Sequence, residues 1–214
     1  MGYTHYWYRD GREIKREVFE RIVNDFKKLL PMFKVLDIKL AGPLGDGEPI
    51  ITNDEVIFNG SKNCGHPKND AVVIPWPAET VKNGVAPKSE DAIVGSWFAG
   101  VLLLQRTCNG DCSYETFYFP RVIDLKEKPL GEIDYYKMNG MPVYREKWQV
   151  GKYFHFCKTA FRPYDLAVQC FLVIAKHHLG NKLIVRSDGD LNHWMEAMTI
   201  CKNAFGYEDF VLNE

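Results

Sequence analysis

Six residues that could do chemistry lie within residues 154–165, whose sequence is FHFCKTAFRPYD: His155, Cys157, Lys158, Thr159, Arg162 and Asp165. If the first half is a strand, His155 and Cys157 share one face near its carboxyl end. Ligands bind at that edge in open α/β sheets. A thiol beside a histidine and a helix N-terminus has a lowered pKa, so Cys157 is a candidate nucleophile and His155 a candidate catalytic partner. The structural alternative is a half-buried cysteine.

The second half of the stretch predicts a helix start that could bind an anion. Pro163 suits the first helical turn, and Asp165 is an acid placed there. Free backbone N–H groups at a helix start favour negative charge, and Lys158 and Arg162 add positive charge. We therefore expect Lys158, Thr159 and Arg162 to bind a phosphate or carboxylate. Alternatively, the lysine faces solvent and the arginine flanks a helix cap.

A second histidine, His5, lies among the aromatic residues of the opening sequence GYTHYWYR. Such aromatics form either a stacking platform for a base or a sugar, or ordinary core. If the two ends of the chain pack together, His5 and His155 face one cleft and could act as general acid and base on a phosphodiester. This layout is similar to that of two-histidine phosphoesterases, but their His-x-Thr/Ser motif is absent here.

An acidic turn, SDGD, follows a buried apolar run near the end of the chain. Asp190 and Gly189 are explained by a helix cap and a turn. Asp188 is not, and we predict it to be a catalytic acid, with Ser187 contacting the ligand. An acid at the end of a strand can hold a metal, a ribose hydroxyl or a proton.

Four further residues have side chains that bind zinc. They are Cys64, His66, Cys108 and Cys112, in the sequences CGH and CNGDC. Three thiols and one imidazole complete a tetrahedral zinc site if the two segments meet. Neither spacing is the C-x2-C form of common zinc motifs, so free thiols flanking a tight turn are the alternative.

The elements that position these residues indicate an α/β (α+β) fold. Residues 1–50 read as a β-α-β unit whose helix ends at Pro31, and residues 151–214 as a β-α-β-α unit. Residues 51–150 form a β-rich insertion of short strands and hairpin turns, and the stretch 125–139 reads as a loop. We expect a single domain over 1–214, in which the two end units are a possible duplication.

Composition excludes several classes of protein. The 214 residues are 46% hydrophobic and 14% aromatic, which is enough for a core. Lys and Arg number 27 against 28 acids, which argues against generic nucleic-acid binding. No apolar run is long enough to span a bilayer, and the N-terminus lacks a signal peptide. We expect a cytoplasmic protein without membrane contact. The sequence leaves its oligomeric state open.

Three of these blocks resemble sequences of an uncharacterised prokaryotic and bacteriophage protein family. The blocks are GYTHYW, CKTA-x-x-PYD and the SDG turn, at both ends of the chain. The resemblance implies a phage-related setting, and it carries over no activity, fold or cofactor. From the residues themselves, we expect a cleft at 155–165 and 187–190 that binds a small phosphorylated or nucleotide-type ligand and hydrolyses or transfers a phosphate ester. The alternative is a non-catalytic binding protein that sequesters nucleotides or contacts another protein.

Overall fold

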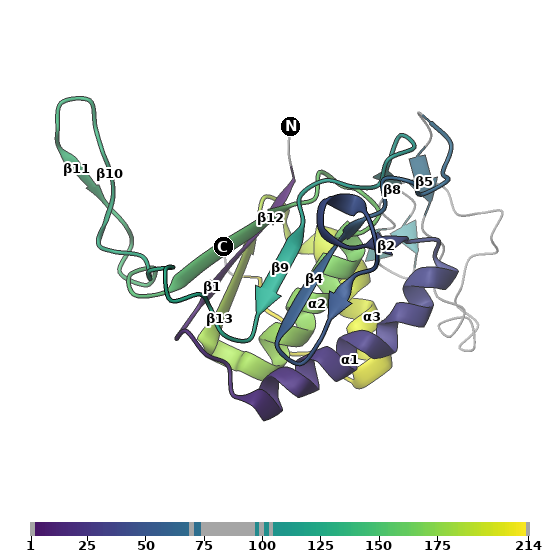
Figure 1. Ribbon diagram of the computed structural model, residues 1–214, viewed down its shortest axis with the longest axis horizontal. Helices are drawn as coiled ribbons and strands as arrows, with labels where there is room; N and C mark the ends of the chain where they lie inside the picture. Colours follow the sequence, from purple (N-terminus) through teal and green to yellow (C-terminus); the bar gives the residue numbers. More distant parts are fainter. Residues whose placement is uncertain (1–2, 69–70, 74–96, 99–100, 103–104, 213–214) are drawn as a thin grey trace.

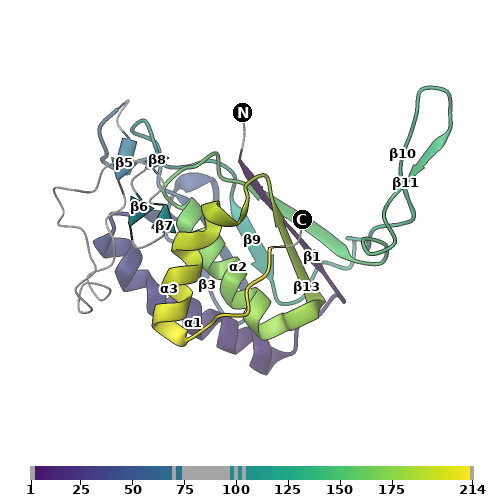
Figure 2. The ribbon, with the colours of Figure 1, turned by 180° about the vertical axis from the view of Figure 1, so that it is seen from behind.

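The computed structural model describes residues 3–68, 71–73, 97–98, 101–102 and 105–212. A layer of antiparallel strands packs against a layer of three helices, and Figures 1 and 2 show the two layers from opposite sides. The helices are α1 (Arg16–Val35), α2 (Asp165–Leu179) and α3 (Met195–Phe205). The predicted mixed α+β class is confirmed.

One sheet joins the two ends of the chain. Its order is β12 (Tyr153–Lys158), β1 (Thr4–Arg9), β13 (Leu183–Ser187), with β1 antiparallel to both neighbours. Helix α2 connects β12 to β13, so the predicted second unit is a β-α-β unit whose strands are split by β1. The start of β1 and the ends of β12 and β13 therefore share one edge.

The second sheet surrounds β4 (Glu55–Gly60), which pairs with β3 (Ile50–Ile51), β9 (Phe117–Pro120) and β2 (Leu40–Ala41). The first predicted unit differs here from the second. Its closing strand, β2, pairs with β4 and not with β1, so α1 connects two different sheets. This difference leaves the suggested duplication without two matching units.

The remaining strands form small hairpins. In the β-rich middle, β5 (Ala71–Val73) pairs with β8 (Gln105–Thr107), and β6 (Trp97–Phe98) with β7 (Val101–Leu102). Strands β10 (Ile133–Tyr136) and β11 (Pro142–Tyr144) form a hairpin where the sequence predicts a loop. This hairpin projects away from the two layers in both views of the ribbon (Figures 1 and 2). Short 3-10 helices in the described part of the chain are η1 (Pro43–Gly45), η4 (Gly180–Lys182) and η5 (Leu191–Trp194).

The core lies between the strand layer and the helices. Helix α2 is buried from its first residue to Ala175, as its apolar sequence predicts. Helix α1 does not end at Pro31 but continues for one more turn to Val35. Phe33 and Leu36 beyond the proline are buried, and this packing holds the last turn. Among the described residues, no helix combines the length and apolarity needed to cross a membrane.

Candidate metal centre and buried histidine network

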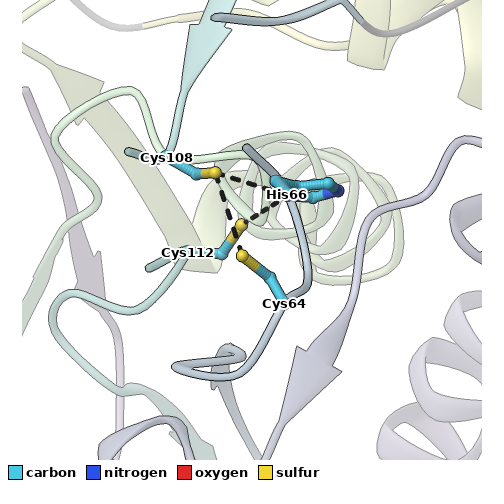
Figure 3. A group of neighbouring side chains, drawn as sticks. All are labelled: Cys64, His66, Cys108 and Cys112. Carbon is cyan, nitrogen blue, oxygen red and sulfur yellow. Dashed lines mark hydrogen bonds between the residues drawn. The ribbon is translucent and has the colours of Figure 1, made fainter. Parts of the chain in front are cut away.

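Cys64, His66, Cys108 and Cys112 converge on one point (Figure 3). Their ligand atoms, one from each residue, all lie within 4.8 Å of one another. The three cysteines are fully buried. Residues separated by more than forty positions in the sequence thus present three sulfurs and one nitrogen to the same point.

The distances match the edges of a zinc tetrahedron. With Zn–S about 2.3 Å and Zn–N about 2.05 Å, tetrahedral edges are about 3.8 Å between two sulfurs and about 3.6 Å between sulfur and nitrogen. Cys64 Sγ and Cys108 Sγ are 3.9 Å apart. His66 Nδ1 lies 3.2 Å from Cys112 Sγ and 3.3 Å from Cys108 Sγ. The donor set and its spacing therefore fit one zinc ion.

The imidazole of His66 is oriented from behind by a carboxylate. Its Nε2 lies 2.9 Å from Oδ2 of Asp37. The carboxylate accepts a hydrogen bond from Nε2–H. Nδ1 then carries no proton and points at the sulfurs. Metal-bound histidines are held in this way by an outer carboxylate, which fixes the ring and makes the ligating nitrogen more basic.

Close backbone packing brings the two cysteine-bearing loops together. The first follows β4 and the second follows β8, and Cys112 N–H donates to the Ser61 carbonyl at 3.0 Å. A Cβ atom on Gly60 would lie 1.9 Å from the Cys112 carbonyl oxygen, so only glycine fits there. Lys39 donates to the carbonyl of Cys64, and Arg162 to that of Cys108. The predicted ligand-binding residue Arg162 therefore contacts the metal-site loop.

Burial raises the pKa of the Cys108 and Cys112 thiols, because a thiolate is poorly solvated there. A bound cation reverses this preference, since it deprotonates a coordinating thiol outright. Three buried thiols that face one another are thus better suited to holding a metal than to nucleophilic chemistry.

A second group of polar side chains surrounds His5 at the shared edge of the first sheet. In the strand register His5 lies opposite Cys157 on one side and Ser187 on the other. His5 is fully buried. Its Nε2 lies 2.7 Å from Oδ1 of Asp165, and its Nδ1 lies 3.1 Å from the Ser187 hydroxyl. Three of the residues singled out in the sequence thus meet in one hydrogen-bonded chain.

The Asp165 carboxylate is held on every side. It accepts hydrogen bonds from Thr159 Oγ1 at 2.5 Å and from Gln169 Nε2 at 3.0 Å. Burial alone would raise its pKa, but His5, Arg106 and Thr159 outweigh burial and the pKa lies below its usual value. Asp165 is therefore a buried carboxylate anion.

Arg106 supplies the buried positive charge of this network. Its guanidinium lies 2.6 Å from Glu196 and 3.6 Å from Asp165. Burial opposes the charge of Arg106, yet the two carboxylates outweigh it and raise the pKa of the guanidinium. These three charges connect strand β8, the start of α2 and helix α3.

Two of the predicted catalytic residues lie elsewhere. His155 is opposite Trp7, stacks on its ring and has Glu127 3.5 Å away, so it does not face His5 across a cleft. Cys157 is fully buried and its thiol donates to the Glu115 carbonyl at 3.5 Å. Burial raises the pKa of the Cys157 thiol, whereas the predicted nucleophile requires a lowered one.

The remaining predicted site residues lie at the sheet edge without meeting one another. Lys158 Nζ sits over the Tyr114 ring, 5.7 Å from its centre, and the backbone N–H of Lys158 donates to Glu115. The hydroxyl of Tyr6 donates to Asp188 at 2.9 Å. Lys158 is thus the last residue of β12 and Asp188 follows the last residue of β13, on either side of β1.

Several residues of both sites were missed in the sequence. Asp165 was explained by the helix start alone, although its place in a buried helix was a signal that it needed partners. Arg106 and Glu196 carried no local signal, because they lie in different elements and only the fold brings them together. Asp37 was not singled out in the sequence, and it lies in the turn after α1.

Comparison with known proteins gives this chain no relative. No protein-family model, no curated protein and no solved structure matches it.

Proposed function

We propose that this protein binds one zinc ion through Cys64, His66, Cys108 and Cys112, and that the ion joins two loops of its β-rich middle. The observation that carries the proposal is the convergence of three sulfurs and one nitrogen within 4.8 Å of one another. Four protein ligands leave no open position for substrate, which is typical of structural and not of catalytic zinc.

The position of the site supports a structural role. One ligand pair follows β4 of the second sheet, and the other follows β8. Arg162, just before α2, contacts the Cys108 carbonyl. Zinc binding would therefore connect two loops and the start of the central helix, and its binding energy would contribute to folding.

Metal analysis of the purified chain tests this proposal. We expect one zinc per chain, and a loss of metal in Cys112→Ala. We also expect a lower melting temperature for Cys112→Ala, because the ion no longer links the two loops. Cys201→Ala is the matched control, since Cys201 is equally buried but lies in α3.

Three other outcomes would each contradict a part of the zinc proposal. A folded protein that carries no metal when prepared in zinc-supplemented buffer contradicts the proposal. Stoichiometric iron in place of zinc contradicts the choice of metal. Retention of zinc in Cys112→Ala contradicts the ligand set.

We also propose a nucleotide-type ligand, as expected from the sequence, and place it on the open face of the first sheet. The supporting observation is a row across three strands, in which Phe156, Tyr6 and Arg186 are direct neighbours. Phe156 is 52% exposed. Phe154 stacks against both Tyr6 and Phe156, with ring centres 6.2 and 6.0 Å away.

The chemistry of this row suits a base and a phosphate. Exposed aromatic rings on a sheet stack bases without requiring a sequence. Arg186 lies at one end of the row, and Lys158 lies two residues after Phe156 at the other end. Both supply positive charge for a phosphate. None of the six cysteines forms a disulfide, which suits the cytoplasmic setting in which such ligands are abundant.

Thermal-shift and fluorescence titrations with mononucleotides test this second candidate. A stacked base contributes roughly 1–3 kcal/mol. Phe156→Ala should therefore weaken binding by about 5- to 150-fold. Tyr144→Ala is the control, because Tyr144 is an equally exposed aromatic on the projecting hairpin. Absence of binding at millimolar nucleotide, or equal affinities in wild type and Phe156→Ala, would contradict the proposed nucleotide site.

A further inference from the structure

We propose that Ser187 is a nucleophile for acyl transfer, activated by His5, which Asp165 positions. This catalytic site is independent of the zinc centre and of the aromatic face. Serine, histidine and aspartate in a hydrogen-bonded chain are recognised by geometry and not by their order in the sequence. Here they come from β13, β1 and the start of α2.

The hydrogen bonds assign the proton positions. Asp165 is an anion and can only accept, so Nε2 of His5, at 2.7 Å, carries the ring proton. Nδ1 then has a free lone pair that can accept a hydrogen bond from the Ser187 hydroxyl at 3.1 Å. The other acceptor near this hydroxyl, the Thr4 carbonyl, lies farther away at 3.4 Å. His5 thus stands as a base beside a hydroxyl, which is the arrangement that activates a serine.

The rest of the network fixes the base in place. Thr159 and Gln169 donate to Asp165, and Arg106 lies 3.6 Å from it. The His5 ring also packs edge-on against Tyr3 and Trp194, each 4.9 Å away between ring centres. An imidazole held by its surroundings need not reorganise when it takes a proton.

Ser187 lines a groove on the surface, whereas His5 and Asp165 lie beneath it. The groove has a volume of about 550 Å³ and is lined by residues 186–191 and 210–212. Leu191 and residues 210–212 form an apolar wall, and Asp188 and Asp190 contribute two carboxyl groups. Arg186 adds one guanidinium to the lining, so the two carboxyl groups leave it with a net negative charge. This lining suits a neutral or cationic acyl group with an apolar chain and disfavours anionic substrates such as phosphate esters.

The reaction balances with water as the second substrate. Ser187 Oγ bonds to the carbonyl carbon of an ester, and its proton passes to Nδ1 of His5. The ester C–O bond then breaks, and His5 returns the proton to the leaving alcohol. Water attacks the acyl-serine with His5 again as base, which releases the acid and restores the hydroxyl.

Gly189 makes the turn that exposes Ser187. Its backbone N–H donates to Ser187 Oγ at 3.1 Å. This bond does not compete with the proton transfer, because a hydroxyl oxygen accepts and donates at once. A Cβ on Gly189 would lie 2.6 Å from the Tyr3 ring, so the close approach requires glycine.

Labelling with a fluorophosphonate probe, which reacts with activated serines, tests the proposal on the full chain. Peptide mass spectrometry should place the label on Ser187, and Ser187→Ala should abolish it. His5→Gln should slow labelling about 100-fold or more, as loss of a general base does. Ser113→Ala, which removes a hydroxyl outside the groove, should label like wild type.

Melting curves and zinc content identify the folded samples, so a defect in His5→Gln is not mistaken for unfolding. If that variant does not fold, Ser187→Ala decides alone. Folded wild-type protein that reacts no faster than Ser187→Ala overturns the proposal, as does a label on another residue. Faster hydrolysis of an anionic ester than of 4-nitrophenyl butyrate overturns the assigned substrate class.

Discussion

The two nitrogens of each histidine decide what the residue can do. In His66 the carboxylate of Asp37 accepts a hydrogen bond from Nε2–H, and Nδ1 points toward the sulfurs. In His5 the carboxylate of Asp165 does the same, which turns Nδ1 toward a hydroxyl. The same kind of partner, a carboxylate, thus orients the proposed metal ligand His66 in one place and the proposed base His5 in the other.

Asp37→Asn should weaken zinc binding by about 10- to 100-fold, because an amide orients His66 less well than a carboxylate does. One zinc per chain should still bind at saturating metal, since all four ligands remain. Competition with a zinc chelator measures the affinity. Asp46→Asn is the control, because Asp46 is also an exposed acid that pairs with a lysine, Lys62. Equal zinc affinities in wild type and Asp37→Asn would show that Asp37 does not orient His66 for metal binding.

Residue types alone identified part of both sites. The zinc ligands were proposed because three thiols and one imidazole complete a tetrahedral site, although neither spacing is the C-x2-C form. The network was seen only in part. His5, Thr159 and Ser187 were picked out, but Asp165, which joins them, was attributed to a helix cap. A polar residue that has a local explanation still needs a partner once it is buried, and the sequence does not name that partner.

At the scale of elements, the last β-α-β unit is the part of the fold that the sequence predicted best. The last β-α-β unit was placed correctly because its helix is apolar on nearly every side and its strands are short apolar runs. The register then follows from the pairing of β1 with both neighbours. It puts His5 beside Ser187 and leaves His155 two residues away, next to Trp7.

The sequence did not predict the features that depend on contacts between distant parts of the chain. The proline in α1 predicted an end, but burial of Phe33 held one more turn. The loop expected at 125–139 contains β10, whose four residues are all exposed and so lack the apolar alternation of a half-buried strand. Strand β2 has only two residues, too few to show which sheet it joins.

At the scale of the whole molecule, the two sites lie at opposite ends of one buried network. Arg162 contacts the metal-site loop, and Asp165, three residues later, contacts His5. Between them lies the start of α2. Because Ala160 and Phe161 both adopt left-handed backbone angles, the chain turns sharply just before this point. One short segment thus contacts both the loop of the candidate metal site and the buried His5.

A separate polar contact ties the first helix to the end of the chain. Asp25 of α1 accepts hydrogen bonds from Lys28 at 2.8 Å and from Tyr207 at 2.7 Å, and lies 2.8 Å from His178 of α2. Burial alone would raise the pKa of Asp25, but these three partners outweigh burial and lower it. The charged carboxylate therefore stabilises the folded state.

The lowered pKa predicts a pH dependence of stability. Asp25→Asn should lower the melting temperature at pH 7 by roughly 2–8 °C, since it removes hydrogen bonds to a charged group. The unfolded carboxyl titrates near its ordinary pKa of about 3.9. The stabilisation is therefore complete above that pH and is lost as the pH falls through the lower folded value. The difference between wild type and Asp25→Asn should shrink from pH 5 to pH 2.

Melting curves of both proteins over this range measure the difference. Glu20→Gln is the control, because it makes the same chemical change on the same helix and should leave the pH profile like that of wild type. Loss of metal in acid affects all three proteins alike, so the difference between them remains the readout. A gap between wild type and Asp25→Asn that stays constant down to pH 2 would show that the charge of Asp25 does not hold these three segments together.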